Sequence, residues 1–211
     1  MSSKTQIIAT LGPASSSVEV LRAMIEGGMD IVRLNFSWGT PEERIGQITT
    51  VRALAQELGR SVAILQDLSG PRIQHEKGHG FNATATQALT EKDLVDLDFG
   101  AAHGLELVAL SFVGEAGDVE RLRAEMQKRS YQARVIAKIE RKIALKCLDE
   151  IIAAADGIMI ARGDLGNEIP LEEIPVVQHQ ILAAANAAKK PVIVATQMML
   201  SMTHEDEPTR A

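Results

Sequence analysis

The sequence predicts an α/β fold of the TIM-type (β/α) barrel class, incomplete, with about seven β/α units and the eighth strand absent. Short apolar or β-branched runs alternate with amphipathic runs along the whole chain, which is typical of parallel strands joined by helices. Polar residues follow five of these runs, as around a ring. No G-x-G-x-x-G motif follows the first run, which argues against the alternative of an open doubly wound sheet. A complete barrel usually takes about 250 residues, and this chain has 211.

Composition indicates one globular domain, 1–211, and excludes several function classes. Hydrophobic residues make up 45% and aromatic residues 3%, and the net charge of −6 is spread without a basic run. Nucleic-acid binding is therefore not expected. No run reaches the roughly 18 apolar residues of a membrane span, so no membrane segment is expected. The single cysteine, Cys147, cannot form an internal disulfide, and we interpret it as a buried apolar group in a cytoplasmic protein.

Turn and capping signals bound the elements of the first third. Residues 5–10 are rich in β-formers and precede Gly12-Pro13, which ends the first strand. Serines precede a helix expected over 18–26, which stops at a Gly-Gly pair before the second strand at 30–34. Thr40 and Pro41 then open a helix to about residue 58, and the third strand follows at 61–66.

The segment 74–87 behaves differently, because it has neither a helical nor a strand period. We interpret it as a short, mobile linker, and its two histidines, His75 and His79, as solvated rather than metal-binding. Beyond it, a helix is expected from Thr90 to about residue 102, because acidic residues occupy its first turn. A strand at 106–111 and a helix at 115–129 follow.

The second half continues the alternation. Apolar runs at 135–137 and 157–161 predict two strands buried on both faces, joined by an amphipathic run. A helix over 171–188 leads to the seventh strand at 191–195. A barrel without its last strand has two unpaired edges, so we expect either a homo-oligomer through the open edge or a terminal segment that covers it.

Charged residues gather where the predicted strands end, and in a barrel these ends surround one pocket. Lys138 and Glu140 follow the fifth strand and point to the same side, and Asp164 follows the sixth. Two carboxylates with oxygen-only ligands would suit Mg²⁺ or Mn²⁺, and a lysine beside that ion would stabilise an oxyanion. The backbone of Gly163 and Asp164 would present N–H groups to an anion. The other strand-end residues are Arg33, Asn35, Ser37, Asp67, Arg162 and Thr196.

A structural role is the alternative for each of these residues. Lysine two positions from glutamate is often a solvated ion pair, and Arg33 would equally serve as a strand-end arginine that extends to solvent. Trp38, close to the same end, is expected to be a packing anchor near the rim. Spacing alone leaves the shared metal site and the ion pair open.

Eight segments resemble pyruvate kinase in order and spacing. They are IIATLGPASS, GGMDIVRLNFSWGT, QDLSGPRI, ALTEKD, AKIE, DGIMIARGDLGNEIPLEEIP, KPVIVATQMMLSM and PTRA, and the resemblance runs from Lys4 to Ala211. It implies a glycolytic barrel enzyme that moves a phosphoryl group between phosphoenolpyruvate and ADP, giving pyruvate and ATP. It also implies Mg²⁺ as cofactor, and K⁺ in the potassium-dependent members.

Site roles follow from the resemblance residue by residue. Lys138 would be the catalytic lysine at the transferred phosphoryl group and the enolate oxygen, with Mg²⁺ held by Glu140 and Asp164. The Gly163-Asp164 backbone would meet the substrate carboxylate. Thr196 would stand near the methylene carbon that is protonated, and Arg33 would contact phosphate. The family's monovalent-cation site is matched by Asn35, Ser37, Asp67 and the carbonyl of Leu68.

The sequence also departs from the family pattern. The segment 74–87 stands where the family carries an inserted lid domain, and strand eight and the C-terminal domain have no counterpart here. Gln74 replaces an arginine near the phosphoryl group, and Trp38 replaces a histidine near the nucleotide. Arg72 stands where potassium-dependent members carry glutamate, so its fixed charge would replace K⁺.

Three functions remain open at this point. The first is phosphoryl transfer, weakened by the missing lid. The second keeps only the enolate chemistry, as magnesium-dependent pyruvate enolisation or oxaloacetate decarboxylation, and needs no ADP. The third is a non-catalytic relative that binds a small carboxylate, or a partner chain through its open edge.

Overall fold

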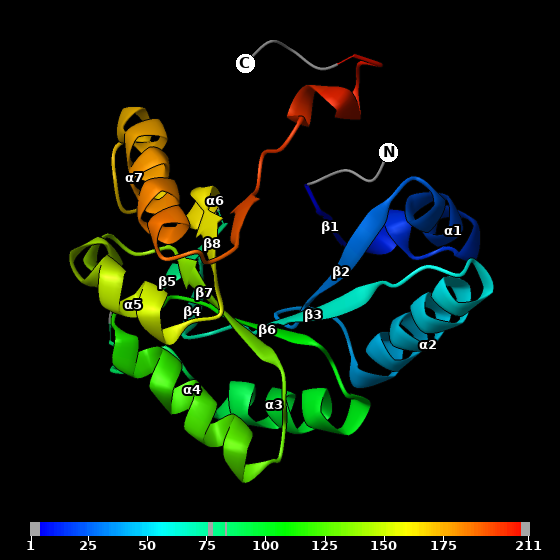
Figure 1. Cartoon of the computed structure of the whole chain (residues 1–211), viewed down its shortest axis with the longest axis horizontal. Coiled ribbons are helices and arrows are strands. Elements are labelled where there is room, and N and C mark those ends of the chain that lie inside the picture. Colours follow the sequence, from blue (N-terminus) through cyan, green and yellow to red (C-terminus); the bar gives the residue numbers. More distant parts are fainter. Residues whose placement is uncertain (1–4, 76–77, 83, 208–211) are drawn as a thin grey trace.

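A seven-stranded parallel sheet curls into a half-barrel in this computed structural model, which describes residues 5–75, 78–82 and 84–207. Figure 1 shows the strands fanning around an open centre. Each neighbouring pair in the order β1-β2-β3-β6-β7-β8-β9 is parallel. The predicted incomplete TIM barrel is therefore confirmed. The strands of this sheet are β1 (Ile7–Thr10), β2 (Met29–Asn35), β3 (Ala63–Asp67), β6 (Leu107–Leu110), β7 (Arg134–Ile139), β8 (Gly157–Ala161) and β9 (Val192–Ala195).

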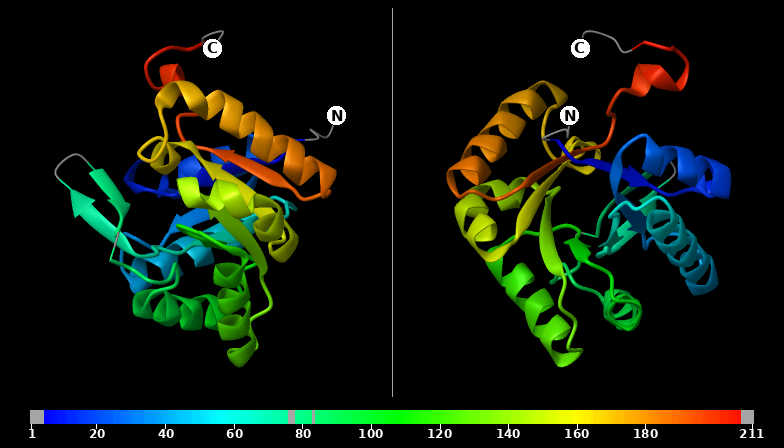
Figure 2. Two further views of the ribbon diagram at one scale, coloured as in Figure 1. Left: turned by 90° about the vertical axis from the view of Figure 1, so that its left-hand side faces the viewer. Right: turned by 45° about the vertical axis from the view of Figure 1, so that its right-hand side comes forward.

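Helices follow the strands and cover the outer face of the sheet (Figures 1 and 2). The main core lies between helices and sheet, whereas a small apolar cluster fills the inside of the half-barrel. The inner cluster is centred on Leu65, Ala109 and Ile136, as the inward positions of barrel strands require. The helices are α1 (Val18–Glu26), α2 (Pro41–Glu57), α3 (Glu91–His103), α4 (Ala116–Lys128), α5 (Leu148–Ala154), α6 (Arg162–Leu165) and α7 (Ile174–Ala187), with 3-10 turns η1 (Pro13–Ser15), η2 (Lys142–Cys147), η3 (Leu171–Glu173) and η4 (Leu200–Thr203).

Local signals explain where the predicted helices begin. Thr40 accepts a hydrogen bond from the Glu43 N–H, and the Glu43 carboxylate accepts one from the Thr40 N–H. This capping box fixes the first turn of α2, with Pro41 at its first position. The helix expected over 171–188 begins instead as the 3-10 turn η3 and becomes α-helical at Ile174. Cys147, expected to be buried, is half-buried.

The prediction of an irregular segment over 74–87 is wrong in its first half. Strands β4 (Arg72–His75) and β5 (Gly78–Phe81) form an antiparallel hairpin, with Arg72 opposite Phe81. The N–H of Asn82 donates to the carbonyl of Pro71 at 2.8 Å and closes the base of the hairpin. The side chains of Gln74, His75 and His79 lie outside the described residues, so their expected roles stay predictions.

The two ends of the sheet, β1 and β9, do not pair with each other within the described part of the chain. The described C-terminal residues, including η4, extend away from the sheet and do not cover its edge (Figure 2). Self-association through this edge therefore stays a prediction. None of the helices in the described ranges is long and apolar enough to cross a lipid bilayer.

Replacing Gly100 of α3 by alanine is expected to destabilise the fold by about 1–3 kcal/mol, because overpacking a tight contact forces neighbours to shift. A Cβ at this position would lie 2.3 Å from Oε1 of the buried Gln66 and 2.8 Å from the Tyr131 hydroxyl. Chemical denaturation measures the change. Gly46 of α2 is the matched control, because nothing lies within 4 Å of its Cβ position. Its alanine variant is expected to gain about 0.5–1 kcal/mol, and equal effects in both variants would contradict the packing argument.

Candidate active site

A buried lysine lies at the carboxyl end of β7, surrounded by oxygen atoms of three strands or their exits. Lys138 is 3% exposed. Its ammonium lies 3.1 Å from Oδ1 of Asp67 and 2.9 Å from Oε1 of Glu140, and it donates to the hydroxyl of Ser111 at 2.8 Å. Asp67 and Glu140 are each 1% exposed. The predicted alignment of Lys138 and Glu140 on one side of the strand is confirmed, and the alternative of a solvated pair is wrong.

Charge pairing outweighs burial at this lysine. Burial opposes the charged form, but the carboxylates of Asp67 and Glu140 hold the pKa of Lys138 above its usual value. Burial likewise opposes ionisation of Asp67, yet the cations of Lys138 and Arg33 keep the pKa of Asp67 below its usual range. The lysine is therefore a fixed positive charge inside the barrel, where its field is weakly screened.

Arg33 joins the same cluster from β2. Its Nε donates to Oδ2 of Asp67 at 2.5 Å, and its Nη1 donates to the hydroxyl of Thr10 at 2.8 Å. The Arg33 side chain is 25% exposed, so the guanidinium is held at the pocket and does not extend into solvent as the alternative proposed. Asp67 thus anchors two cations that converge on the open side of the half-barrel.

Glu140 and Asp164 form an acid pair beside the lysine. The backbone N–H of Phe112 donates to Oε2 of Glu140 at 2.7 Å, and Phe112 takes a positive φ of 58° to present it. Oε1 of Glu140 is buried and faces the Lys138 ammonium at 2.9 Å. Burial raises the pKa of Glu140, Lys138 opposes this, and the negative charge of Asp164 raises it further.

Glu140 and Asp164 both line a cavity of about 200 Å³. Its remaining lining residues are Gly80, Phe81, Phe112, Asn167 and Glu168. The described residues contain no group of three or more acidic, histidine or cysteine side chains arranged to hold a metal. Two carboxylates that line one cavity nevertheless fit Mg²⁺, which binds proteins through one or two carboxylates and takes its other ligands from substrate and water.

The residues matched to a monovalent-cation site are already bound by protein donors. The Leu68 carbonyl accepts from the Ser111 hydroxyl at 2.6 Å, and the Asn35 side chain accepts from the Ser37 N–H at 3.0 Å. The carboxylate of Asp67 forms ion pairs with Arg33 and Lys138. Only the Ser37 hydroxyl is buried without a partner among these four residues, so we derive no step through a monovalent cation.

Arg72 and Trp38, both near the rim, make contacts other than those that their expected roles require. The Arg72 guanidinium lies 6.0 Å from the centre of the Phe112 ring, and no described contact joins it to Asp67, so its replacement of K⁺ stays a prediction. Trp38, expected as a packing anchor, is 59% exposed. Its carbonyl accepts from Arg44 at 2.7 Å, which means that the backbone and not the indole ring anchors this turn.

The exits of β8 and β9 meet on the other side of the pocket. The N–H of Gly163 donates to the Thr196 hydroxyl at 3.0 Å. Arg162 reaches across to the carbonyls of Ala195 and Thr196. Thr196 has a φ of 68°, a strained conformation for a β-branched residue. Arg162 and Gly163 therefore hold Thr196 at the exit of β8.

Sequence reasoning missed two residues of the site. Ser111 bridges Lys138 and the Leu68 carbonyl, and the N–H of Phe112 fixes Glu140. Both follow β6. The residues directly after this strand are uncharged, so the sequence did not predict them as site residues. The available signal was the polar Ser111 directly after a buried apolar strand.

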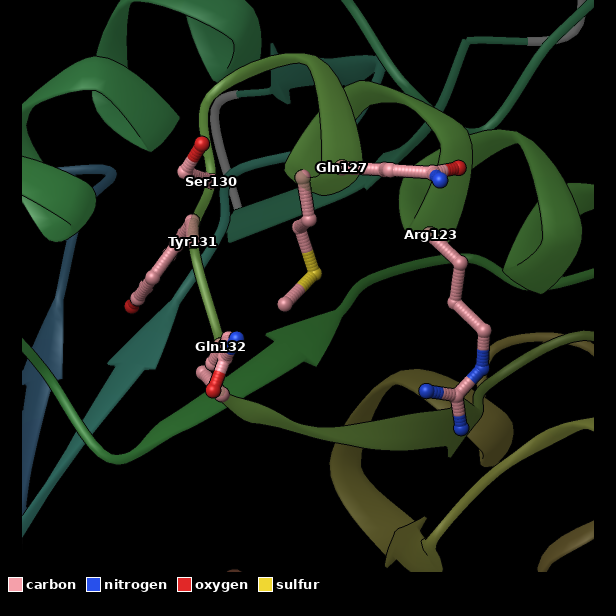
Figure 3. A pocket seen from close by; sticks show the side chains of 7 residues that line it. Arg123, Gln127, Ser130, Tyr131 and Gln132 are labelled. Atoms are coloured by element: carbon pink, nitrogen blue, oxygen red, sulfur yellow. The ribbon is translucent and has the colours of Figure 1, made fainter.

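A second hollow, of about 440 Å³, lies at the opposite end of the barrel (Figure 3). It is lined by the end of α4 and by the residues that precede β7. Its cation, Arg123, is committed to the Ala154 carbonyl and to Asp156 at 2.9 Å. Because the strands of a barrel present ligand-binding groups at their carboxyl ends, the cavity lined by Glu140 and Asp164 is the candidate site.

Comparisons with known proteins agree with this geometry. The model of the pyruvate kinase barrel domain matches residues 2–86 and 79–211, so the match breaks at the hairpin. Pyruvate kinase of Thermococcus litoralis is 36% identical over 290 positions, which cover all of this chain and 61% of that protein. The Geobacillus stearothermophilus enzyme is 34% identical over 294 positions, with 50% of its length covered.

Pyruvate kinase of Mycobacterium intracellulare is also 34% identical, over 292 positions and 62% of its length. The chain thus spans about half to three fifths of the length of these curated relatives. The segments that align include the strand ends carrying Lys138, Glu140 and Asp164. On the evidence of the family model and these relatives, the chain belongs to the pyruvate kinase family and carries its barrel domain.

Proposed function

We propose that this chain binds phosphoenolpyruvate and pyruvate at the pocket of Lys138, Glu140 and Asp164, and transfers the phosphoryl group between phosphoenolpyruvate and ADP. The observation that carries the proposal is the charged, buried Lys138 beside Glu140, whose carboxylate lines the same cavity as Asp164. A fixed cation of this kind stabilises the enolate that remains when the phosphoryl group leaves.

Each side chain has a role that its contacts support. The ammonium of Lys138, oriented by Asp67 and Ser111, would face the enolate oxygen, and Arg33 would hold a phosphate oxygen. The Gly163-Asp164 backbone would bind the substrate carboxylate. The Thr196 hydroxyl, held by the Gly163 N–H, would relay the proton to the methylene carbon.

A divalent ion completes this proposal. Glu140 and Asp164 would hold Mg²⁺ or Mn²⁺, and the bound ion would supply a Lewis acid that neutralises negative charge on the enolate and on phosphate. The lining of one cavity by both carboxylates supports this assignment.

The cavity favours a second candidate from the same chemistry. Its volume of about 200 Å³ is below the roughly 300 Å³ at which pockets for larger organic ligands begin. Enolisation of pyruvate, or decarboxylation of oxaloacetate, needs only the small ligand and the divalent ion. Proton exchange into the methyl group of pyruvate without ADP-dependent turnover would favour this candidate over phosphoryl transfer.

Magnesium and phosphoenolpyruvate together are expected to raise the melting temperature more than the sum of their separate effects, because each completes the binding site of the other. Saturation at 100 times the dissociation constant stabilises a protein by about 2.7 kcal/mol. Thermal melting with each ligand alone and with both measures this. Glu140→Gln, which removes one carboxylate charge, is expected to lose the joint effect, and an undiminished joint effect in this variant would contradict the assigned site.

Turnover is then measured with ADP in an assay coupled to lactate dehydrogenase. ADP-dependent pyruvate formation supports phosphoryl transfer. Joint stabilisation without turnover with ADP would contradict phosphoryl transfer and leave the enolate chemistry as the proposed function.

A further inference from the structure

The hairpin β4–β5 is fastened over the carboxyl ends of β6 and β7 by one aromatic side chain. The ring of Phe81 lies 5.6 Å from the ring of Phe112, tilted by 53°. The second contact of the Phe81 ring is with Arg141, whose guanidinium lies 3.7 Å from the ring centre. A ring between an aromatic neighbour and a cation has little freedom to swing away.

The rings of Phe81 and Phe112 supply the apolar lining of the cavity that the acid pair, Glu140 and Asp164, also lines. Phe81, Phe112 and Gly80 line one part, whereas Glu140, Asp164, Asn167 and Glu168 supply its polar atoms. The backbone of Phe112 is fixed because its N–H bonds to Glu140. Phe81 comes from the hairpin and is therefore the wall that a substitution can move without disturbing the acid pair.

A ligand that fits this cavity has a defined orientation. Its carboxylate and oxo or enol oxygens belong beside the polar lining, where a divalent ion held by Glu140 and Asp164 would bind them. Its hydrocarbon part then lies against Phe81 and Phe112. In this cavity of about 200 Å³ a methyl or methylene group would contact the two rings, whereas an aromatic substituent in the same place would have to displace the Phe81 ring.

We infer that Phe81 determines the size of the ligand, so that the pocket takes small oxo acids and their enols, and excludes those with a bulky substituent on the carbon beside the oxo group. This inference rests on the proposed function, because it assumes that oxo acids bind at Lys138 and the acid pair. Arg141 is a positioning residue in this arrangement, since it holds the Phe81 ring without lining the cavity.

The test compares pyruvate with phenylpyruvate, each with Mg²⁺, by isothermal titration calorimetry on the full chain. Wild type is expected to bind pyruvate and to bind phenylpyruvate at least about tenfold more weakly, the scale on which pockets discriminate apolar groups. Phe81→Ala is expected to raise the ratio of phenylpyruvate affinity to pyruvate affinity at least about tenfold. Arg141→Met is expected to raise this ratio less, because it loosens the ring and leaves it in place.

Two further variants make the test specific. Phe81→Leu keeps an apolar contact with Phe112 and is expected to shift in the same direction by a smaller factor, which covers the case that Phe81→Ala folds poorly. Val95→Ala, at a position 68% exposed on α3, is the control and is expected to leave the ratio of affinities unchanged.

The outcomes separate this inference from the proposed function. If wild type binds neither acid with Mg²⁺, the proposed function fails and the inference fails with it. If wild type binds pyruvate but Phe81→Ala and Phe81→Leu keep the wild-type discrimination, the inference alone is overturned. Equal affinity of wild type for both acids would also overturn it.

Discussion

Replacement of Lys138 by methionine is expected to lower the rate of phosphoryl transfer, and of proton exchange into pyruvate, by about 10²–10³-fold, the usual effect of removing one group that stabilises an oxyanion. Methionine keeps the length of the side chain but removes the charge that Asp67, Glu140 and Ser111 hold in place. Exchange of methyl protons, followed by NMR with and without magnesium, measures the loss.

The control for this substitution is Lys146→Met in η2, an exposed lysine eight residues further along the same segment. It removes the same charge from the protein without touching the pocket, so its exchange rate is expected to match wild type. Exchange by Lys138→Met at the wild-type rate would exclude this lysine from the chemistry and with it both enzymatic proposals.

Asp67→Asn is expected to reduce the free energy of unfolding by about 3–5 kcal/mol, because removing one partner of a buried ion pair leaves uncompensated charge in the interior. Asp67 is 1% exposed and contacts both Arg33, at 2.5 Å, and Lys138, at 3.1 Å. Both cations lose their shared counterion in the variant. Urea denaturation followed by circular dichroism measures the change.

Glu57→Gln offers a matched comparison on the surface. Glu57 pairs with Arg22 at 2.7 Å, a distance similar to those at Asp67, but both side chains are open to solvent. Surface pairs contribute little because water screens them, so the denaturation midpoint is expected to stay near that of wild type. Similar midpoints for Asp67→Asn and Glu57→Gln would show that the buried cluster is not stabilising.

The central strands β6, β7 and β8 could be predicted because they are buried on both faces and therefore read as short apolar runs. The observed β8 coincides with the predicted strand at 157–161, and the cap at Thr40 placed the start of α2. The hairpin was missed for a physical reason. Its stability comes from cross-strand pairing and from Phe81 packing on a distant strand exit, and neither leaves a period in the local sequence.

The candidate site likewise contains some contacts that the local sequence predicts and others that it does not. The side-chain alternation of a strand is enough to place Lys138 and Glu140 together. The contact of Lys138 with Asp67 spans β3, β6 and β7, and depends on how strongly the sheet curls, which no local pattern encodes. Ser111 was overlooked because a serine after a strand is common, and Trp38 was misplaced because its size suggested burial whereas its turn is anchored through backbone carbonyls.

The pairing of the strands also ranks the parts of the site by rigidity. Lys138 lies on β7, which is hydrogen-bonded to neighbours on both sides, whereas Thr196 follows β9, which pairs with β8 alone among the described strands. The group proposed to relay the proton is thus attached to the margin of the sheet, and the cation to its middle. Any strand or partner that docks against β9 would therefore restrain the proton-relay step directly, while the charge at Lys138 is already in place without it.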